Sequence, residues 1–136
     1  MYKKVLVCTH GRFGEELIKS VEMITGPLTN TVAVSLLPGM SVEEYHEKLR
    51  TELDKENETL CLVDIFGGTP SHSVLYMSQE YPLDIICGVN LPVLLESSTM
   101  TSYDSKEEFK EHLIDVYKTN GYDVLERMRN NGNSVS

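Results

Sequence analysis

The chain has no long hydrophobic run and no excess of positive charge, and each absence excludes a class of function. No apolar stretch approaches the roughly 18 residues of a transmembrane helix, and no signal-peptide pattern precedes the first apolar run. The 136 residues include 12 Lys and Arg against 21 Asp and Glu, a formal net charge of −9. Nucleic acids and anionic membranes are bound by clusters of basic residues, so neither is an expected partner. We expect one cytoplasmic domain.

Cysteine is scarce, and the common motifs for metals and nucleotides are missing. Cys8, Cys61 and Cys87 lie in apolar runs and form no CxxC pair, so we expect three reduced, buried thiols. The sequence has no HxxxH or HExxH for zinc and no GxxxxGK[ST] for nucleotide phosphates. It also lacks the GxSxG of α/β-hydrolases. We therefore expect no metal, no cofactor and no ATP site.

What the chain does have is a regular alternation of apolar runs and helical patterns. Strands are predicted over 4–8, 31–37, 59–63 and 83–87, and helices over 15–24, 41–55, 70–79, 92–100 and 105–117. Ser41 and Glu44 form a capping-box pattern at the start of the second helix. Such alternation is typical of an α/β fold, a doubly wound parallel sheet with helices on both faces. In the flavodoxin-like order 2-1-3-4, the first and third strands are neighbours.

The C-terminal pattern leaves two interpretations open. After the turn signal Asn120-Gly121, the segment 122–128 fits either a short edge strand or a last helix. Residues 130–136 are polar, so we expect one domain over 1–129 followed by a flexible tail.

Two polar residues follow the first and third predicted strands. His10 ends the first apolar run, and Asp64 comes directly after the run 60–63. Because ligands bind at the carboxyl ends of parallel strands, and these two strands are expected to be neighbours, the side chains should lie side by side there. A neutral imidazole is a nucleophile, and a carboxylate that accepts its other N–H orients it and stabilises the developing cation. We predict that His10 is the catalytic nucleophile and that Asp64 orients it.

The segment Gly67-Gly68-Thr69-Pro70 predicts a binding site for an anion. Pro70 suits the first position of a helix, and Thr69 would then be the N-cap residue. Gly67 and Gly68 would let the backbone approach a ligand closely. Free amides and the positive end of the helix dipole would face a phosphoryl group. We predict that Gly67, Gly68 and Thr69 bind phosphate.

Three further histidines, His46, His72 and His112, lie in predicted helices and are expected at the surface. His72 is close to the predicted anion site, and Arg12 follows His10, but the pattern assigns neither a role.

Together these residues resemble the IIA domain of the mannose family of the phosphoenolpyruvate-dependent sugar phosphotransferase system (PTS). The resemblance extends from the first strand to about Met128. It is carried by Thr9-His10-Gly11, Pro38-Gly39, Leu62-Val63-Asp64, Gly67-Gly68-Thr69-Pro70 and Gly88-Val89-Asn90-Leu91-Pro92, in this order. It implies a phosphocarrier in which His10 takes a phosphoryl group from the protein HPr and passes it to a IIB component. The IIB component then phosphorylates sugar that enters through the membrane components IIC and IID. The resemblance also implies that Asp64 orients the imidazole and that Thr69 contacts the phosphoryl group.

The same resemblance implies a homodimer whose subunits exchange an antiparallel edge strand, and this favours a strand over 122–128. Many relatives join IIA to IIB, whereas this chain ends in a short polar tail, so we expect a separate IIA subunit that meets IIB in trans. Three alternatives stay open: a subunit that feeds a dihydroxyacetone kinase, a non-catalytic module whose phosphorylation a transcriptional regulator reads, and a hydrolase that uses the His–Asp pair. The intact Gly-Gly-Thr-Pro turn favours the sugar-transport branch, and the lack of a second acid or metal motif disfavours a hydrolase.

Overall fold

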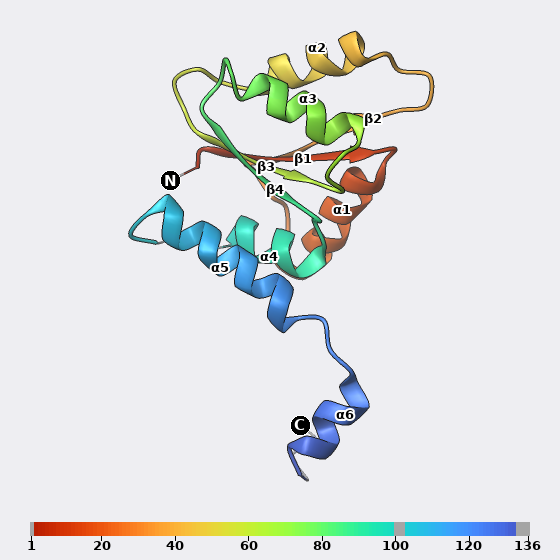
Figure 1. Cartoon of the computed structure of the whole chain (residues 1–136), viewed down its shortest axis with the longest axis vertical. Helices are drawn as coiled ribbons and strands as arrows, with labels where there is room; N and C mark the ends of the chain where they lie inside the picture. Colours follow the sequence, from red (N-terminus) through yellow and green to blue (C-terminus); the bar gives the residue numbers. More distant parts are fainter. Residues whose placement is uncertain (1, 100–102, 133–136) are drawn as a thin grey trace.

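The computed structural model describes residues 2–99 and 103–132, and its centre is a parallel sheet covered on both faces (Figure 1). The strands are β1 (Lys4–His10), β2 (Thr31–Leu36), β3 (Thr59–Val63) and β4 (Leu83–Cys87). They pair in parallel in the order β2-β1-β3-β4. The predicted α/β fold class and strand order are confirmed.

Helices form a layer on each face of this sheet (Figure 1). On one face lie α1 (Phe13–Thr25), α4 (Leu91–Thr99) and α5 (Lys106–Thr119), and on the other lie α2 (Val42–Glu52) and α3 (Thr69–Met77). Alternate strand residues point to opposite faces. Leu60 and Leu62 of β3 therefore pack in the first core, and Cys61 and Val63 in the second. All five residues of β3 are buried, which explains why four of them, 60–63, are apolar.

The start of α2 is as the sequence predicts. The Ser41 hydroxyl accepts the Glu44 N–H at 3.1 Å, and the Ser41 N–H donates to the Glu44 carboxylate at 3.1 Å. These reciprocal bonds satisfy two amides that the first turn of the helix leaves without partners.

The C-terminal segment departs from prediction. It forms a helix, α6 (Val124–Asn130), so the predicted antiparallel strand over Tyr122–Met128 is wrong. Local groups favour the helix, because the Asp123 side chain accepts the Glu126 N–H at 2.9 Å and basic side chains lie in the last turn. Figure 1 shows α6 projecting away from the sheet, where it meets no strand to pair with. Of the predicted tail 130–136, residues 133–136 lie outside the described residues.

The cysteines are all free thiols, but they differ in burial. Cys8 and Cys61 are completely buried, as predicted. Cys87 is exposed, so the prediction that it is buried is wrong. It is the last residue of β4, an edge strand with a neighbour on one side only. In residues 2–99 and 103–132, no helix has both the length and the hydropathy to cross a membrane.

Candidate functional site

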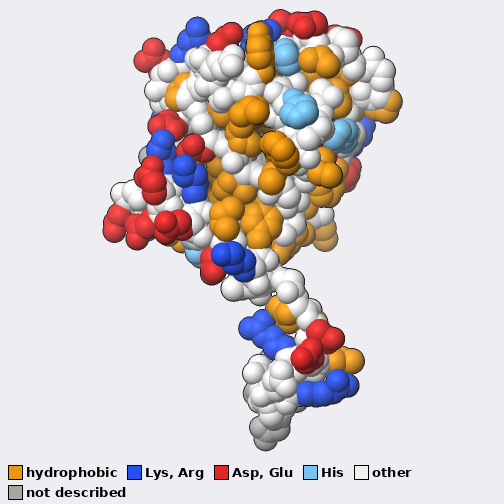
Figure 2. Space-filling view, in the orientation of Figure 1, with side chains coloured by type: hydrophobic (Ala, Val, Ile, Leu, Met, Phe, Trp, Pro, Cys, Tyr) orange, Lys and Arg blue, Asp and Glu red, His pale blue; other side chains and the backbone are white. Residues whose placement is uncertain are grey.

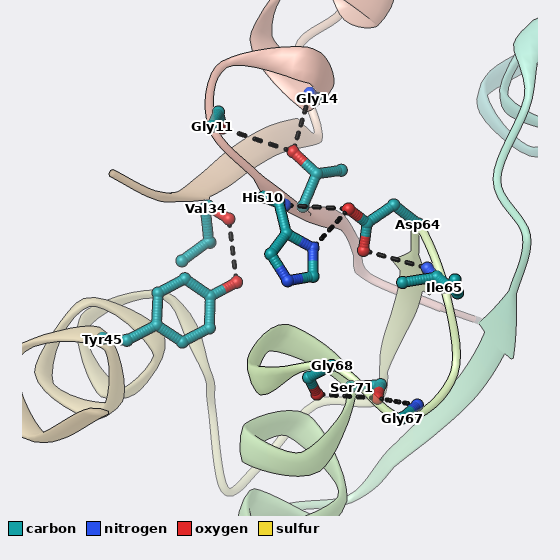
Figure 3. Close-up of polar contacts among 11 residues, drawn as sticks. His10, Gly11, Gly14, Val34, Tyr45, Asp64, Ile65, Gly67, Gly68 and Ser71 are labelled. Carbon is teal, nitrogen blue, oxygen red and sulfur yellow. Dashed lines mark hydrogen bonds and ion pairs between the residues drawn. The ribbon is translucent and has the colours of Figure 1, made fainter. Parts of the chain in front are cut away.

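The first and third strands bring His10 and Asp64 into direct contact (Figure 3). Cys8 of β1 pairs with Val63 of β3, so the residues that follow emerge at the same edge of the sheet. Nδ1 of His10 lies 2.9 Å from Oδ2 of Asp64, and the backbone N–H of His10 donates to the same oxygen at 2.9 Å. The other oxygen, Oδ1, accepts the Ile65 N–H at 2.9 Å. The predicted proximity of the two side chains is confirmed, and three donors hold the carboxylate in place.

This contact decides which nitrogen of His10 can react. A carboxylate only accepts hydrogen bonds, so Nδ1 carries the proton in the neutral ring and the lone pair is on Nε2. The His10 side chain is 50% exposed, whereas that of Asp64 is 14% exposed. The site therefore presents an exposed imidazole whose carboxylate partner is mostly shielded from solvent.

The two glycines after β3 have different reasons to be glycine. Gly67 has φ +99°, a backbone conformation that residues with a side chain rarely adopt. Gly68 has an ordinary φ, but a Cβ at that position would lie 2.5 Å from Cε1 and 3.0 Å from Nε2 of His10. The predicted close approach at this turn therefore exists, and its immediate neighbour is the imidazole of His10.

The start of α3 corrects one sequence prediction. Gly68 is the extended N-cap residue (φ −92°, ψ 174°), so α3 begins at Thr69 and the prediction that Thr69 is the N-cap is wrong. Pro70 lies in the first turn, as predicted. The Ser71 hydroxyl, which sequence reasoning missed, accepts the Gly67 N–H at 2.9 Å and donates to the Gly68 carbonyl at 3.0 Å. The Gly67 amide is thus already bonded within the protein.

Thr9 fixes the loop that leads from His10 into α1. Its buried hydroxyl accepts the Gly14 N–H at 2.9 Å and donates to the Gly11 carbonyl at 3.4 Å. A Cβ on Gly14 would lie 3.1 Å from the Val7 carbonyl oxygen, so α1 lies close against β1. This packing makes the backbone beside His10 rigid.

Exposed apolar side chains follow His10 and Asp64 closely along the chain. Phe13 is 48% exposed, Ile65 59% and Phe66 71%, and we call these three residues the hydrophobic rim. Arg12 also lies beside the site, where its guanidinium is 3.1 Å from the Glu15 carboxylate. The Ser35 hydroxyl donates to the same carboxylate and, with Arg12, lowers the pKa of Glu15. Large apolar side chains left in water around a reactive group are typical of a surface that binds another protein.

The other histidines lie outside the His10–Asp64 pair. His72 is exposed, as predicted, and its ring lies edge-on to Phe66 at 6.2 Å between centroids. His46 is buried, so its predicted surface position is wrong: it extends from α2 to α3, where Nε2 is 3.0 Å from the Ser73 hydroxyl. His112 is half-buried beside Glu96, at 3.1 Å. Within the described parts of the chain, no cluster of His, Cys, Asp and Glu side chains is arranged to hold a metal ion.

Comparisons with known proteins agree with this geometry. The family model EIIA-man, described as the PTS system fructose IIA component, matches residues 4–114. The fructose-specific EIIA component of Bacillus subtilis (strain 168) is 34% identical over 114 residues, which cover 80% of this chain and 77% of that protein. The mannose-specific EIIAB component of Escherichia coli (strain K12) is 33% identical over 112 residues, which cover 79% of this chain and 34% of that longer protein.

A solved structure extends the likeness to three dimensions. The mannose/sorbose-specific IIA subunit of the phosphotransferase system from Enterococcus faecalis has a TM-score of 0.81 and 27% identity, covering 90% of this chain and 95% of its own. The family model alone spans most of the chain and includes the strand ends that hold His10 and Asp64. The chain therefore belongs to the EIIA-man family, the IIA phosphocarrier components of the sugar phosphotransferase system, which transfer phosphoryl groups by way of a histidine.

Proposed function

We propose that Nε2 of His10 accepts a phosphoryl group from HPr and passes it to a IIB component, which phosphorylates sugar entering through membrane components IIC and IID. The observation that carries this proposal is the 2.9 Å contact of Nδ1 with Asp64, on a His10 side chain that is 50% exposed. The proposed location is the cytoplasm. The relatives are components of sugar phosphotransferase systems, which does not favour the dihydroxyacetone-kinase, purely regulatory or hydrolytic alternatives.

The chemical step is an exchange between two imidazoles. Nε2 of His10 attacks phosphorus in line, the P–N bond to the donor histidine breaks, and the donor ring leaves with its electron pair. The His10 ring then carries positive charge, which the Asp64 carboxylate stabilises through Nδ1–H. Transfer in the reverse sense uses the same geometry, so onward transfer to IIB needs no rearrangement of the pair.

The start of α3 is the proposed binding site for the transferred group. Phosphoryl transfer depends mainly on positioning and on neutralising charge at the equatorial oxygens. The first amides of a helix and the positive end of its dipole provide such neutralisation. Because the Gly67 amide already donates to Ser71, we assign direct contact to the amides of Gly68 and Thr69 and to the Thr69 hydroxyl. Gly67 contributes to the proposed phosphoryl-binding site through its backbone conformation.

The hydrophobic rim is the proposed contact surface for HPr and IIB. Phe13, Ile65 and Phe66 are exposed and lie within three residues of His10 or Asp64 along the chain, so we expect a partner that presents a histidine there to cover them. The net charge of −9 favours partners with a basic surface and speeds their encounter.

We further propose a homodimer in which the C-terminal segment contacts the partner subunit. Tyr122, Val124 and Leu125 are 53%, 60% and 66% exposed on or beside α6. A helix of seven residues is not stable by itself in water, so its apolar side chains need a surface to cover them. Figure 2 shows hydrophobic side chains gathered on the face formed by α3, β4 and α5, where β4 is an unpaired sheet edge.

Phosphorylation in a reconstituted system tests the role of His10. With phosphoenolpyruvate, the upstream kinase component and HPr, the wild type should gain the mass of one phosphoryl group, acid-labile and base-stable, on the peptide that contains residue 10. His10→Ala should gain none, because the nucleophile is missing, whereas the control His72→Ala should be labelled at the wild-type rate. Persistent labelling of His10→Ala would refute the assignment. Transfer of the label to IIB, and not to an ADP-loaded dihydroxyacetone kinase subunit, would support the sugar-transport role.

A further inference from the structure

Ser71 is a buried serine whose hydroxyl closes the turn beside His10 (Figure 3). Its side chain is on α3, and the residue is only 3% exposed. The hydroxyl accepts the Gly67 N–H at 2.9 Å and donates to the Gly68 carbonyl at 3.0 Å. Both hydrogen-bonding capacities of the hydroxyl are therefore used on two consecutive peptide groups of the same turn.

That turn consists of two consecutive glycines, so its backbone needs hydrogen bonds to hold it in one conformation. Glycine has more backbone freedom than any other residue, and ordering it costs correspondingly more. Gly67 is held at φ +99°, and Gly68 is extended, so a Gly-Gly pair without a tether would sample many other conformations. The two hydrogen bonds of Ser71 stabilise the observed conformation of the turn.

The position of the turn matters because the imidazole rests against it. A Cβ on Gly68 would come within 2.5 Å of Cε1 and 3.0 Å of Nε2 of His10, so the ring and the turn are in close contact. On its other side the ring is bonded through Nδ1 to Asp64. His10 is thus held between a carboxylate and a clamped glycine turn.

We infer that Ser71 is a positioning residue for phosphoryl transfer: its hydroxyl holds the Gly67–Gly68 turn against the His10 ring and so fixes the direction of Nε2. This inference rests on the proposed role of His10. Ser71 does not touch the reacting atoms and acts only through the turn. In-line attack requires alignment of the nucleophile with phosphorus, and small misplacements lower the rate steeply.

The chain offers a matched control two residues further along α3. Ser73 is also a buried serine, 2% exposed, but its hydroxyl contacts a side chain, that of His46, with Nε2 at 3.0 Å. That contact links α3 to α2 and does not involve the glycine turn. Ser71→Ala and Ser73→Ala therefore each remove one buried hydroxyl from the same helix, but only the first releases the turn.

Two measurements distinguish a role of Ser71 in positioning His10 from a role in the stability of the fold alone. In imidazole ¹H–¹⁵N NMR spectra, Ser71→Ala should shift or broaden the His10 signals, and Ser73→Ala should change those of His46 and leave His10 as in the wild type. The rate of phosphorylation by phospho-HPr should fall about ten- to a hundredfold in Ser71→Ala and stay at the wild-type level in Ser73→Ala. Ser71→Thr, which keeps the hydroxyl, should restore both readouts. Ser71 lines a cavity of about 200 Å³ with Phe66 and Leu75.

Equal rates and unchanged His10 signals in Ser71→Ala would overturn the inference, as would a Ser71→Thr variant that folds but stays slow. If Ser71→Ala fails to fold, Ser71→Cys carries the same expectation, because a thiol is a weak hydrogen-bonding group of similar size. If the wild type is not phosphorylated at His10, the proposed function fails, and the NMR comparison of the serine variants still decides whether Ser71 positions the ring.

Discussion

At the scale of single residues, the proposed role of His10 depends on the contacts of Nδ1 and of the Cε1–Nε2 edge of its ring. Asp64 accepts Nδ1–H and the His10 backbone N–H with one oxygen, and the Ile65 N–H with the other. An asparagine cannot accept all three, because its amide nitrogen is a donor that would face another donor. It also lacks the charge that stabilises the phosphorylated imidazolium.

We therefore expect Asp64→Asn to lower the phosphorylation rate of His10 by about 10²- to 10⁴-fold, in line with the loss of the orienting carboxylate in other His–Asp pairs. The circular dichroism spectrum should stay that of the wild type, since Asp64 lies at the sheet edge and outside both cores. Single-turnover labelling with phospho-HPr measures the rate. A wild-type rate in a folded Asp64→Asn protein would remove the orienting role.

Gly68 tests the Cε1–Nε2 edge of the ring. In Gly68→Ala the new methyl group would lie 2.5 Å from Cε1 of His10, so the imidazole must move away from its present position. We expect at least a tenfold loss of transfer rate, with normal folding because Gly68 already has a φ that alanine adopts. Gly121→Ala is the control, since a Cβ there meets nothing within 4 Å. Equal rates in the two variants would show that ring placement does not limit transfer.

Sequence reasoning finds His10 and Asp64 because each directly follows an apolar run, and the ends of neighbouring parallel strands must meet. It misses Ser71 because the role of that hydroxyl depends on how the glycine turn folds back, and residue types do not specify this. A serine in the first turn of a helix that follows a glycine pair is a weak signal that such a bond can form. The buried position of His46 likewise depends on how α2 packs on α3.

At the scale of secondary structure elements, Asp84 of β4 connects the edge strand to the N-terminal segment and to α5. Its carboxylate accepts the Tyr2 hydroxyl, and the ammonium groups of Lys110 and Lys106 lie 3.4 Å and 4.0 Å away. Partial burial alone would raise the pKa of Asp84, but the Tyr2 hydrogen bond and the two lysines outweigh burial and lower it. A carboxyl group whose pKa is lower in the folded state stabilises the fold above its ordinary pKa, and this stabilisation is lost as the pH falls through the lowered value.

Asp84→Asn should therefore lower the free energy of unfolding at pH 7 by about 1–2 kcal/mol, and the difference from the wild type should shrink below pH ~4. Urea unfolding at pH 7 and at pH 3 measures this difference. Asp104→Asn changes the same charge at an exposed position before α5 and should have little effect at either pH. If the wild type and Asp84→Asn differ in free energy of unfolding by the same amount at both pH values, the charge on Asp84 does not contribute to stability.

The elements that the sequence predicts well are those whose hydrophobic pattern fits one type of secondary structure. Strands β1 and β3 are apolar on both faces because helices cover each face of the sheet. Their apolar runs can be recognised as strands without information on distant contacts. The segment after Asn120 is short and mixed in pattern, so its structure depends on its neighbours. In the single chain the Asp123 cap decides for a helix. The prediction that Cys87 is buried is wrong for a related reason, since the exposure of Cys87 depends on β4 being an edge strand.

At the scale of the whole molecule, helices cover both faces of the sheet, β4 is one of its two edge strands, and α6 projects away from the sheet (Figure 1). Leu75 of α3 lines a cavity with Ile85 and Cys87 of β4 and is 52% exposed, and Ile114 of α5 is 43% exposed. His10 and Asp64 come from one chain, whereas this surface is not covered within one chain. We therefore expect assembly and phosphoryl transfer to be separable by mutation.

A homodimer is the expected consequence, and its test uses the exposed residues of α6. The wild type should have twice the chain mass in light scattering after size exclusion. The double substitution Val124→Asp and Leu125→Asp should weaken association at least tenfold, because each side chain contributes about 1.5–3 kcal/mol when fully buried. Met23→Asp, at an 88% exposed position on α1, should leave the dimer intact. A monomeric wild type across a wide concentration range, or a double variant that stays dimeric, would contradict the proposed role of α6. Phosphorylation of His10 by phospho-HPr should persist in the monomeric variant, since the imidazole, Asp64 and the glycine turn all come from one chain.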